Sequence, residues 1–236
     1  MTDLSTHSTP QFILKTINRF SGIDWGTKDM AIAYDTWWNT RNRKSYVFNP
    51  SNPNIKPKII SDRNYQDTYS DPGSFLRSRN EFNRSVLKMH YGNIFLRGQG
   101  FSPSGQFPFI DKVNTKTFEK TRVYQSSYTD KIESIIDYDP KKNQLTVSIE
   151  SPSEYPNYYT KKVKSGKLEK LTNLKNPFLE LQNVKKEKIT YLRNDGVELS
   201  GILYLPLNYD KEKKEKMPMI LWAYPREFKD KKSASQ

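Results

Sequence analysis

Aromatic and basic side chains lie close together near the start of the chain, and they are the first residues that could do chemistry. Trp37 and Trp38 are adjacent, and Arg41, Arg43 and Lys44 follow within a few residues. An indole ring is a good face for a guanidinium or a ligand ring to stack on. The group could therefore clamp a ligand, or it could cap a sheet and pack a loop. We favour the structural role and keep ligand binding as the alternative.

The two histidines, His7 and His90, are the other side chains of catalytic or metal-binding type. His7 lies in a polar tail, and His90 follows an apolar stretch beside Tyr91. Neither has a second metal ligand at helical or strand spacing. The chain has no cysteine, which excludes disulfides, thiol catalysis and cysteine-bound metals. We expect no metal site and no cofactor.

The stretch from Gly100 to Gly105, GFSPSG, is close in form to the turn that carries a nucleophilic serine. It departs from G-x-S-x-G because the second glycine is one residue late. Pro103 also follows Ser102, where the motif needs a sharp strand-to-helix turn. We expect an ordinary turn between two strands. The chain also lacks a G-x-G-x-x-G sequence and a P-loop.

The charge balance is strongly basic, with 39 Lys and Arg against 26 Asp and Glu, a net charge of +13. The lysines form short clusters in expected turns, and no expected helix carries a basic stripe. This pattern favours a solvated surface over a nucleic-acid partner. Aromatic residues make up 13% of the chain, which indicates a folded, mainly β protein. No apolar run reaches the ~20 residues of a membrane span, and the first residues do not have the form of a signal peptide.

A repeat of strand pairs occupies most of the chain, from Arg19 to about Gln182. In each pair a strand enters a polar turn and a second short strand leaves it. The expected outer pairs are Ser45–Arg63, Pro108–Ser126 and Tyr158–Leu174, and Ser165-Gly166 forms the tip of the third. The inner strands expected before them are Asp29–Asp35, Arg84–Met89 with Asn93–Arg97, and Gln144–Glu150. This order favours four-stranded propeller blades over a β-sandwich, and three blades cannot close a ring.

The last fifty or so residues have a different pattern. A linker over 176–187 comes first, and in it we expect Phe178, Leu179 and Leu181 to form a helical turn that packs between domains. Two alternating apolar runs then flank an Asn194-Asp195-Gly196 turn. A charged loop follows, and a continuous apolar run from Met217 to Tyr224 ends at Pro225. This pattern predicts the opening strands of an α/β domain. We therefore divide the chain into a tail (1–18), a partial propeller of about three blades (19–175), the linker and the start of an α/β domain (188–236).

Several stretches together resemble the prolyl oligopeptidase family of serine peptidases, at the junction between propeller and catalytic domain. The stretch WAYPREFK (Trp222–Lys229) is the most telling, and it resembles the glutamyl-endopeptidase-like branch. Further matching stretches are RFSGIDWG (19–26), WWNTR (37–41), YSDPGS (69–74), ESPSEYPNYY (150–159), LEKLTNLKNP (168–177) and ITYLRNDGVELSGILYLPLNYD (189–210). The likeness runs through nearly the whole chain from Arg19 onward.

The resemblance implies a two-domain serine oligopeptidase in which a β-propeller covers an α/β-hydrolase domain and admits small or unstructured peptides. Its catalytic residues follow in the order Ser, Asp, His, and all three come after the third hydrolase strand. With Met217–Tyr224 as that strand, the chain would be a fragment that contains no catalytic residue and is inactive alone. The resemblance also suggests a periplasmic or secreted full-length protein, and the oligomeric state stays open. The alternatives are a non-catalytic propeller-like binding module and a basic nucleic-acid-binding protein.

Two residues after the expected third strand are candidates for a site. Tyr224 matches the place where several relatives carry a tyrosine whose hydroxyl donates to the oxyanion, although Pro225-Arg226-Glu227 departs from their glycine-rich form. The alternative for Tyr224 is packing at the strand end. Arg226 could bind an acidic substrate side chain with two parallel hydrogen bonds, which would suit cleavage after glutamate. The alternative for Arg226 is an ion pair with Glu227 or a neighbouring loop.

Overall fold

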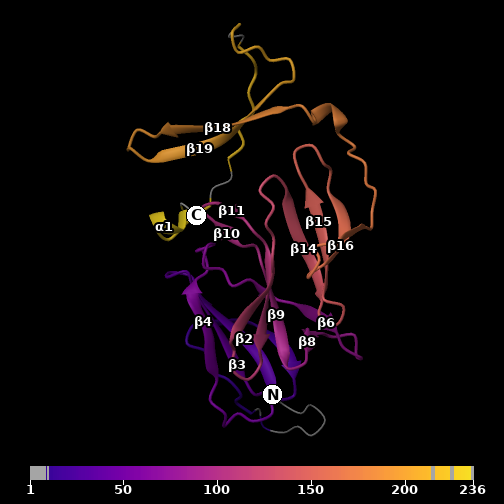
Figure 1. Ribbon diagram of the computed structural model, residues 1–236. Coiled ribbons are helices and arrows are strands. Elements are labelled where there is room, and N and C mark those ends of the chain that lie inside the picture. The colour runs from indigo at the N-terminus through magenta and orange to yellow at the C-terminus, as the bar shows by residue number, and fades with distance from the viewer. Residues whose placement is uncertain (1–8, 10, 214–215, 224–225, 235–236) are drawn as a thin grey trace.

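The fold is mainly β and antiparallel in the computed structural model, which describes residues 9, 11–213, 216–223 and 226–234 (Figure 1). Its first sheet has four strands in the order in which they follow along the chain. These are β1 (Arg19–Thr27), β2 (Met30–Trp37), β3 (Asn42–Phe48) and β4 (Lys58–Asn64). The consecutive residues Ala31, Ile32 and Ala33 of β2 are fully buried, so this strand is covered on both faces of the sheet.

The second sheet places β9 (Asn93–Gly98) and β12 (Phe109–Asn114) at its centre, each with buried apolar residues. Three further strands complete it on both sides: β13 (Lys120–Gln125), β5 (Ser74–Phe75) and β8 (Met89–His90). Two small hairpins accompany it, namely β6 (Arg77–Arg79) with β7 (Ser85–Leu87), and β10 (Phe101–Ser102) with β11 (Gly105–Gln106).

The third sheet again has four strands in chain order. They are β14 (Ile132–Asp139), β15 (Gln144–Glu150), β16 (Asn157–Lys162) and β17 (Leu168–Lys170). In β15, buried Leu145, Val147 and Ile149 alternate with half-buried residues. This period of two is what a strand with one face in the core requires.

The three expected outer strand pairs are confirmed as β3–β4, β12–β13 and β16–β17, each antiparallel. The turn at Ser165-Gly166 is also confirmed, with Gly166 at φ +67°. The inner strand expected over Arg84–Met89 is wrong, because β7 pairs with β6 and only Met89–His90 pair with β9. The Asn80 side chain, which accepts a hydrogen bond from the Arg84 backbone N–H, closes this local hairpin.

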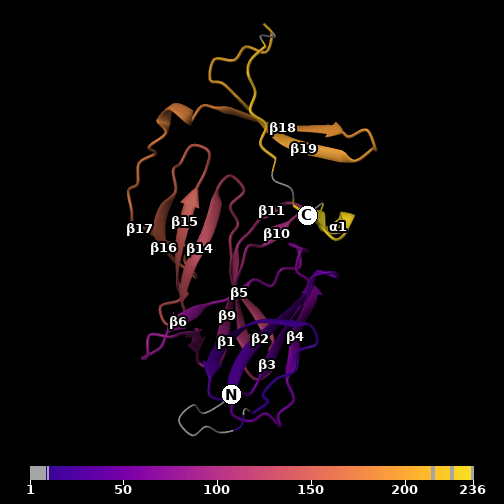
Figure 2. The same ribbon diagram turned by 180° about the vertical axis from the view of Figure 1, so that it is seen from behind.

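The core lies between neighbouring sheets, which pack on one another in chain order (Figures 1 and 2). One apolar cluster joins the first and second sheets and includes Ile32, Ile94 and Val113. Another joins the second and third sheets through Phe95, Ile110, Leu145 and further residues. Full burial of an isoleucine or leucine contributes about 1.5–3 kcal/mol. These interfaces therefore hold the sheets together face to face.

The C-terminal part begins with a 3₁₀ turn, η1 (Leu179–Leu181), and a hairpin of β18 (Lys185–Leu192) and β19 (Glu198–Leu205). The expected turn between these two strands is confirmed, with Gly196 at φ +79°. The helical turn is present, but its apolar side chains are more than half exposed, so the expected packing between domains is wrong. Strand β18 also begins within the predicted linker, at Lys185.

The strand expected over Met217–Tyr224 is wrong for the residues that the structure describes. Residues 216–223 have no strand assignment, and Ile220 and Trp222 are 94% and 86% exposed. A buried parallel strand needs hydrogen-bonded neighbours and covered faces. The β18–β19 hairpin forms a two-stranded sheet of its own, so the apolar run lies in water. After it the chain returns to the first sheet and ends in α1 (Lys231–Ala234) (Figure 1).

Candidate functional site

The two residues predicted for a site have different outcomes. Tyr224, with Pro225, lies outside the described residues, so its role as an oxyanion donor stays a prediction. Arg226 is exposed, and its guanidinium carbon lies 4.8 Å from the ring centroid of Phe228. Glu227 pairs with Arg41 at 2.8 Å. The ion pair expected as an alternative between Arg226 and Glu227 is therefore replaced by a contact with the first sheet.

Arg41 sits in the turn between β2 and β3 and is held from several directions. Its backbone is left-handed, at φ +54°, which is uncommon for a residue with a side chain. Its N–H donates to the carbonyl of Trp38 at 3.2 Å, and its carbonyl accepts from the Tyr65 N–H at 2.8 Å. The guanidinium lies 3.7 Å from the Trp38 ring centroid and donates to the Trp38 carbonyl. The predicted packing of the tryptophan–arginine group is thus confirmed for Trp38 and Arg41.

Gln66, just after β4, contacts the backbone of the C-terminal segment at two points. Its side-chain Nε2 donates to the carbonyl of Glu227 at 2.6 Å, and its Oε1 accepts from the Lys229 N–H at 2.8 Å. The Gln66 side chain is buried, and the Gln66 N–H donates to the Asn64 side chain at 2.9 Å. The Gln66 side-chain amide therefore donates to one residue of the C-terminal segment and accepts from the residue two positions later.

Asn64 extends this contact to the last described residues. Its Nδ2 donates to the Ser233 Oγ at 3.2 Å, and Ser233 is buried. The Ser233 N–H donates to the Asp230 carboxylate at 2.8 Å, and hydrogen bonds from Ser233 hold the pKa of Asp230 below its usual value. Figures 1 and 2 both place α1 beside the end of β4. Residues 227–233 are thus fixed to the first sheet at several points.

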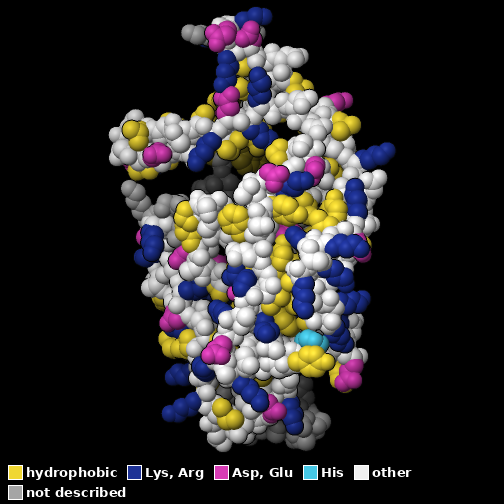
Figure 3. Space-filling view, viewed as in Figure 1, with side chains coloured by type: hydrophobic (Ala, Val, Ile, Leu, Met, Phe, Trp, Pro, Cys, Tyr) yellow, Lys and Arg dark blue, Asp and Glu magenta, His cyan; other side chains and the backbone are white. Residues whose placement is uncertain are grey.

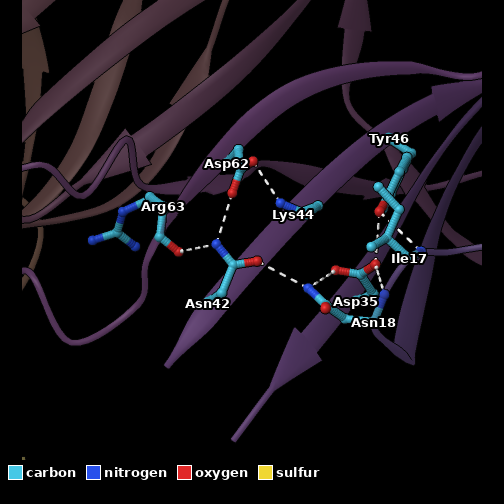
Figure 4. Close-up of polar contacts among 8 residues, drawn as sticks. All are labelled: Ile17, Asn18, Asp35, Asn42, Lys44, Tyr46, Asp62 and Arg63. Atoms are coloured by element: carbon cyan, nitrogen blue, oxygen red, sulfur yellow. Dashed lines mark hydrogen bonds and ion pairs between the residues drawn. The ribbon is translucent and has the colours of Figure 1, made fainter. Parts of the chain in front are cut away.

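A polar network that is buried at Asp35 ties together the strands that carry this contact (Figure 4). Asp35 is fully buried and accepts hydrogen bonds from the Tyr46 hydroxyl at 2.7 Å and from the backbone and side chain of Asn18 at 2.7 and 3.1 Å. Asn18 donates on to Asn42 at 2.9 Å, and Asn42 donates to Asp62 at 2.7 Å. The network links β2, β3 and β4, and so it fixes the base of the turn that holds Arg41.

The titration behaviour of this network follows from its contacts. Burial, and then the hydrogen bond to Asp35, raise the pKa of Tyr46 to about 12. A hydrogen bond from Lys44, followed by one from Asn42, lowers the pKa of Asp62. A buried carboxylate needs hydrogen-bond donors to remain in place. Asp35 has three of them, and its role here is structural.

A cavity of about 200 Å³ lies between the first and second sheets. Asp24 is buried in its wall, where it accepts from the Tyr34 hydroxyl at 2.7 Å and pairs with Arg77 at 2.5 Å. Burial, and then the hydrogen bond to Asp24, raise the pKa of Tyr34. Arg43 lies over the Tyr34 ring at 4.7 Å. Lys44 does not join this group, since it pairs with Asp62 on β4.

The remaining candidates from the sequence do not form a catalytic or metal site among the described residues. His90 lies against the ring of Tyr91, with 4.2 Å between ring centroids, and His7 lies outside the described part. No described cluster of His, Asp and Glu could hold a metal ion. Ser102 lies in the β10–β11 hairpin and donates to the Gly105 carbonyl at 3.0 Å. The expected turn over Gly100–Gly105 is therefore confirmed.

The surface charges and the character of the helices bear on possible partners. Figure 3 shows lysine and arginine side chains scattered over this face of the molecule, with acidic side chains among them. Within the described part of the chain, no helix has the length and apolar character needed to cross a membrane.

Two proteins that match the chain over nearly its whole length are named as peptidases. One is the "Probable glutamyl endopeptidase, chloroplastic" of Arabidopsis thaliana, 33% identical over 96% of this chain. The protein of the same name from Oryza sativa subsp. japonica is 32% identical over 96% of it. The predicted resemblance to the glutamyl-endopeptidase-like branch of the prolyl oligopeptidase family is thus confirmed. The chain spans about a quarter of these relatives, 25% and 26% of their lengths.

Other comparisons add little to this likeness. No protein-family model matches the chain. Among solved structures, the AtxE2 isopeptidase without ligand has a TM-score of 0.38 at 11% identity and covers 88% of this chain and 27% of its own. An uncharacterized protein of Listeria monocytogenes has a TM-score of 0.41 at 13% identity, with 72% of this chain and 45% of that one covered.

The sequence did not reveal the contact of Gln66 and Arg41 with the C-terminal segment. The partners of Gln66 lie 161 and 163 residues away, and Glu227 lies 186 residues from Arg41. Nothing local marks Gln66 as a binding residue. The only signal was the tryptophan–arginine group, which pointed to Arg41 but not to its partner.

Proposed function

We propose that the chain is part of a serine-type peptidase that cleaves small or unstructured peptides, with a preference for glutamate before the cleaved bond. In this proposal the catalytic serine, aspartate and histidine lie outside the 236 residues of this chain. The observation that carries the proposal is the likeness to two glutamyl endopeptidases over 96% of the chain but only about a quarter of their length. Peptides are accordingly the proposed substrates.

The architecture supports this assignment. Three successive antiparallel sheets, two of them simple four-stranded meanders, pack face to face in chain order, as blades of a propeller do. After them, apolar side chains of β18, β19 and residues 217–222 are exposed in an unusual number. Strands of an α/β-hydrolase sheet that meet their parallel neighbours and helices would have such faces covered.

The chemistry supports the placement of the catalytic residues elsewhere. A serine hydroxyl is a weak nucleophile until a base removes its proton, and the base must be held in turn by a third group. Of the two histidines in the chain, His90 is placed against Tyr91, and His7 belongs to the N-terminal tail. The 236-residue chain therefore contributes scaffold and substrate contacts to the proposed enzyme.

Arg226 is the residue that we assign to the glutamate preference. It is exposed and stands next to Glu227, which is fixed to the first sheet. A guanidinium binds a carboxylate through two parallel hydrogen bonds, a geometry that a lysine cannot reproduce. In this proposal the segment that Arg226 and Glu227 form against the first sheet lies close to the reacting bond.

The test is peptide hydrolysis by the natural protein that contains this chain. Arg226→Met should reduce kcat/KM on glutamyl peptides by about tenfold to a hundredfold, as loss of a charge-assisted pair does, and leave neutral peptides nearly unchanged. Lys229→Met is the matched control, because it removes a neighbouring charge and keeps the backbone N–H. An equal loss of kcat/KM on both kinds of peptide would contradict the role of Arg226. Absence of any hydrolysis would contradict the proposed function.

A further inference from the structure

The buried guanidinium of Arg41 has a feature that packing alone does not explain. Arg41 is 3% exposed, and its Nε is the buried side-chain nitrogen without a hydrogen-bond partner among the described residues. Burying a cation is costly unless it is paired. Its anionic partner, Glu227, comes from the far end of the chain at 2.8 Å. The turn of the first sheet therefore presents a cation for a carboxylate that another part of the molecule supplies.

The contact recognises both a side chain and a backbone. Arg41 binds the Glu227 carboxylate. Gln66 binds the Glu227 carbonyl and, two residues on, the Lys229 N–H. A single amide that binds a carbonyl and the N–H two residues later selects for extended chain, because the two groups must point to the same side. The surface formed by Arg41, Asn64 and Gln66, which we call the latch, thus has the chemistry of a site for a glutamate in an extended segment.

Contacts within the first sheet hold the Arg41 side chain and the backbone of Gln66 in place. Arg41 is set by its left-handed backbone, by the Trp38 ring and by the Tyr65 N–H. The Gln66 N–H is bound by the Asn64 side chain. The Asp35 network holds the strands from which these turns emerge (Figure 4). Preformed groups bind with little loss of side-chain entropy.

We propose that the latch is an interaction site for the segment around Glu227 and that it fixes Arg226 in one position. The first sheet would then act directly on the segment that follows the exposed apolar run over 217–222. Arg41 and Gln66 are positioning residues in this proposal, because they reach the substrate only through Glu227 and its neighbours. The binding of the segment stands on the contacts themselves, and the role of Arg226 rests on the proposed function.

The binding step can be tested on this chain without any peptidase activity. Hydrogen exchange of the Lys229 amide, followed by NMR, reports the bond to Gln66 directly. Gln66→Met keeps the side-chain length and removes both hydrogen bonds, and it should speed exchange at Lys229 by about tenfold. Glu227→Gln removes the charge, and it should speed exchange at the same amide. The matched control Glu81→Gln, in the exposed turn between β6 and β7, should change nothing.

Amides of β2 and β15 serve as the check that each variant is folded. If they keep their protection while exchange at Lys229 is unchanged by Gln66→Met, the latch is contradicted. If Gln66→Met unfolds the chain, Glu227→Gln alone decides, because its side chain is 72% exposed and tolerates substitution.

The positioning step is tested in the natural protein by the ratio of kcat/KM on glutamyl and neutral peptides. Gln66→Met should lower this ratio several-fold with neutral hydrolysis retained, whereas a merely structural role would lower both rates together. An unchanged ratio in a variant with fast Lys229 exchange would contradict positioning and leave the latch intact. Absence of hydrolysis in the unaltered protein would instead count against the proposed function.

Discussion

Single residues carry buried charge between the second and third sheets. Glu133 is 1% exposed and pairs with Lys161 of β16 at 2.8 Å. The Tyr124 hydroxyl, from β13, donates to Glu133 and accepts from Lys161. Burial, and then the hydrogen bond to Glu133, raise the pKa of Tyr124. A pair of this kind stabilises little by itself, but removal of one partner leaves the other charge buried.

Lys161→Met should therefore destabilise the chain by about 3–5 kcal/mol, because the Glu133 carboxylate loses its counter-charge. Lys162→Met, the next residue on the same strand and exposed, should change the free energy of unfolding by less than about 0.5 kcal/mol. Urea denaturation measures both. Adding Glu133→Gln to Lys161→Met should restore part of the loss, and a further loss would show that the charge pair is not the cause.

The raised pKa of Tyr46 predicts the direction in which the free energy of unfolding changes with pH. Its pKa is about 12 in the folded chain and about 10 in an unfolded chain, so the folded state holds the phenolic proton more tightly. The contribution is complete below about pH 10 and is lost as the pH rises towards 12. Tyr46→Phe should therefore lose less stability between these pH values than the unaltered chain, measured by urea denaturation. Parallel losses in both proteins would contradict the assignment to Tyr46.

At the scale of elements, one glycine fixes how β5 joins the second sheet. Gly73 has φ +85°, and a Cβ there would lie 2.3 Å from the Arg97 carbonyl of β9. The neighbouring backbone would have to move, so β5 would lose its pairing with β9.

Gly73→Ala should cost about 1–3 kcal/mol, as strain at such a position does. Gly22→Ala in β1 is the control, because a Cβ there meets nothing within 4 Å, and its cost should stay within about 0.5 kcal/mol. Thermal unfolding of the two variants measures the difference. Equal melting temperatures would show that β5 is not held by this close approach.

Some of the strands and turns could be predicted from the sequence, and others could not. Outer strand pairs were predictable because alternation and turn residues are local signals, as at Ser165-Gly166 and at Asn194–Gly196. The run over Met217–Tyr224 misled us, because an apolar run looks the same whether or not a partner strand is present to pair with it. The contact of Arg41 with Glu227 could not be predicted from local sequence, because it joins residues 186 positions apart.

At the scale of the whole molecule, apolar side chains near the C-terminal end are exposed to solvent. Met219, Ile220, Leu221 and Trp222 are between 74% and 94% exposed. Hydrophobic side chains also border the opening beneath the β18–β19 hairpin (Figure 3). Surface of this kind promotes association when it has no partner.

The double substitution Ile220→Ser, Trp222→Ser should reduce self-association of the chain, measured by sedimentation velocity. The free energy of unfolding should change by less than about 0.5 kcal/mol, because these side chains contribute no core contacts. Reduced stability with unchanged association would mean that the run packs inside the chain, contrary to the structure.

We propose that this chain supplies scaffold and substrate contacts to a serine peptidase whose nucleophile lies outside it. The most direct measurement treats the natural protein with a fluorophosphonate, which reacts with activated serine hydroxyls, and maps the modified residue by mass spectrometry. We expect one labelled serine, outside the 236 residues of this chain. A label on a serine within this chain, such as Ser102, or no label on the active protein, would contradict it.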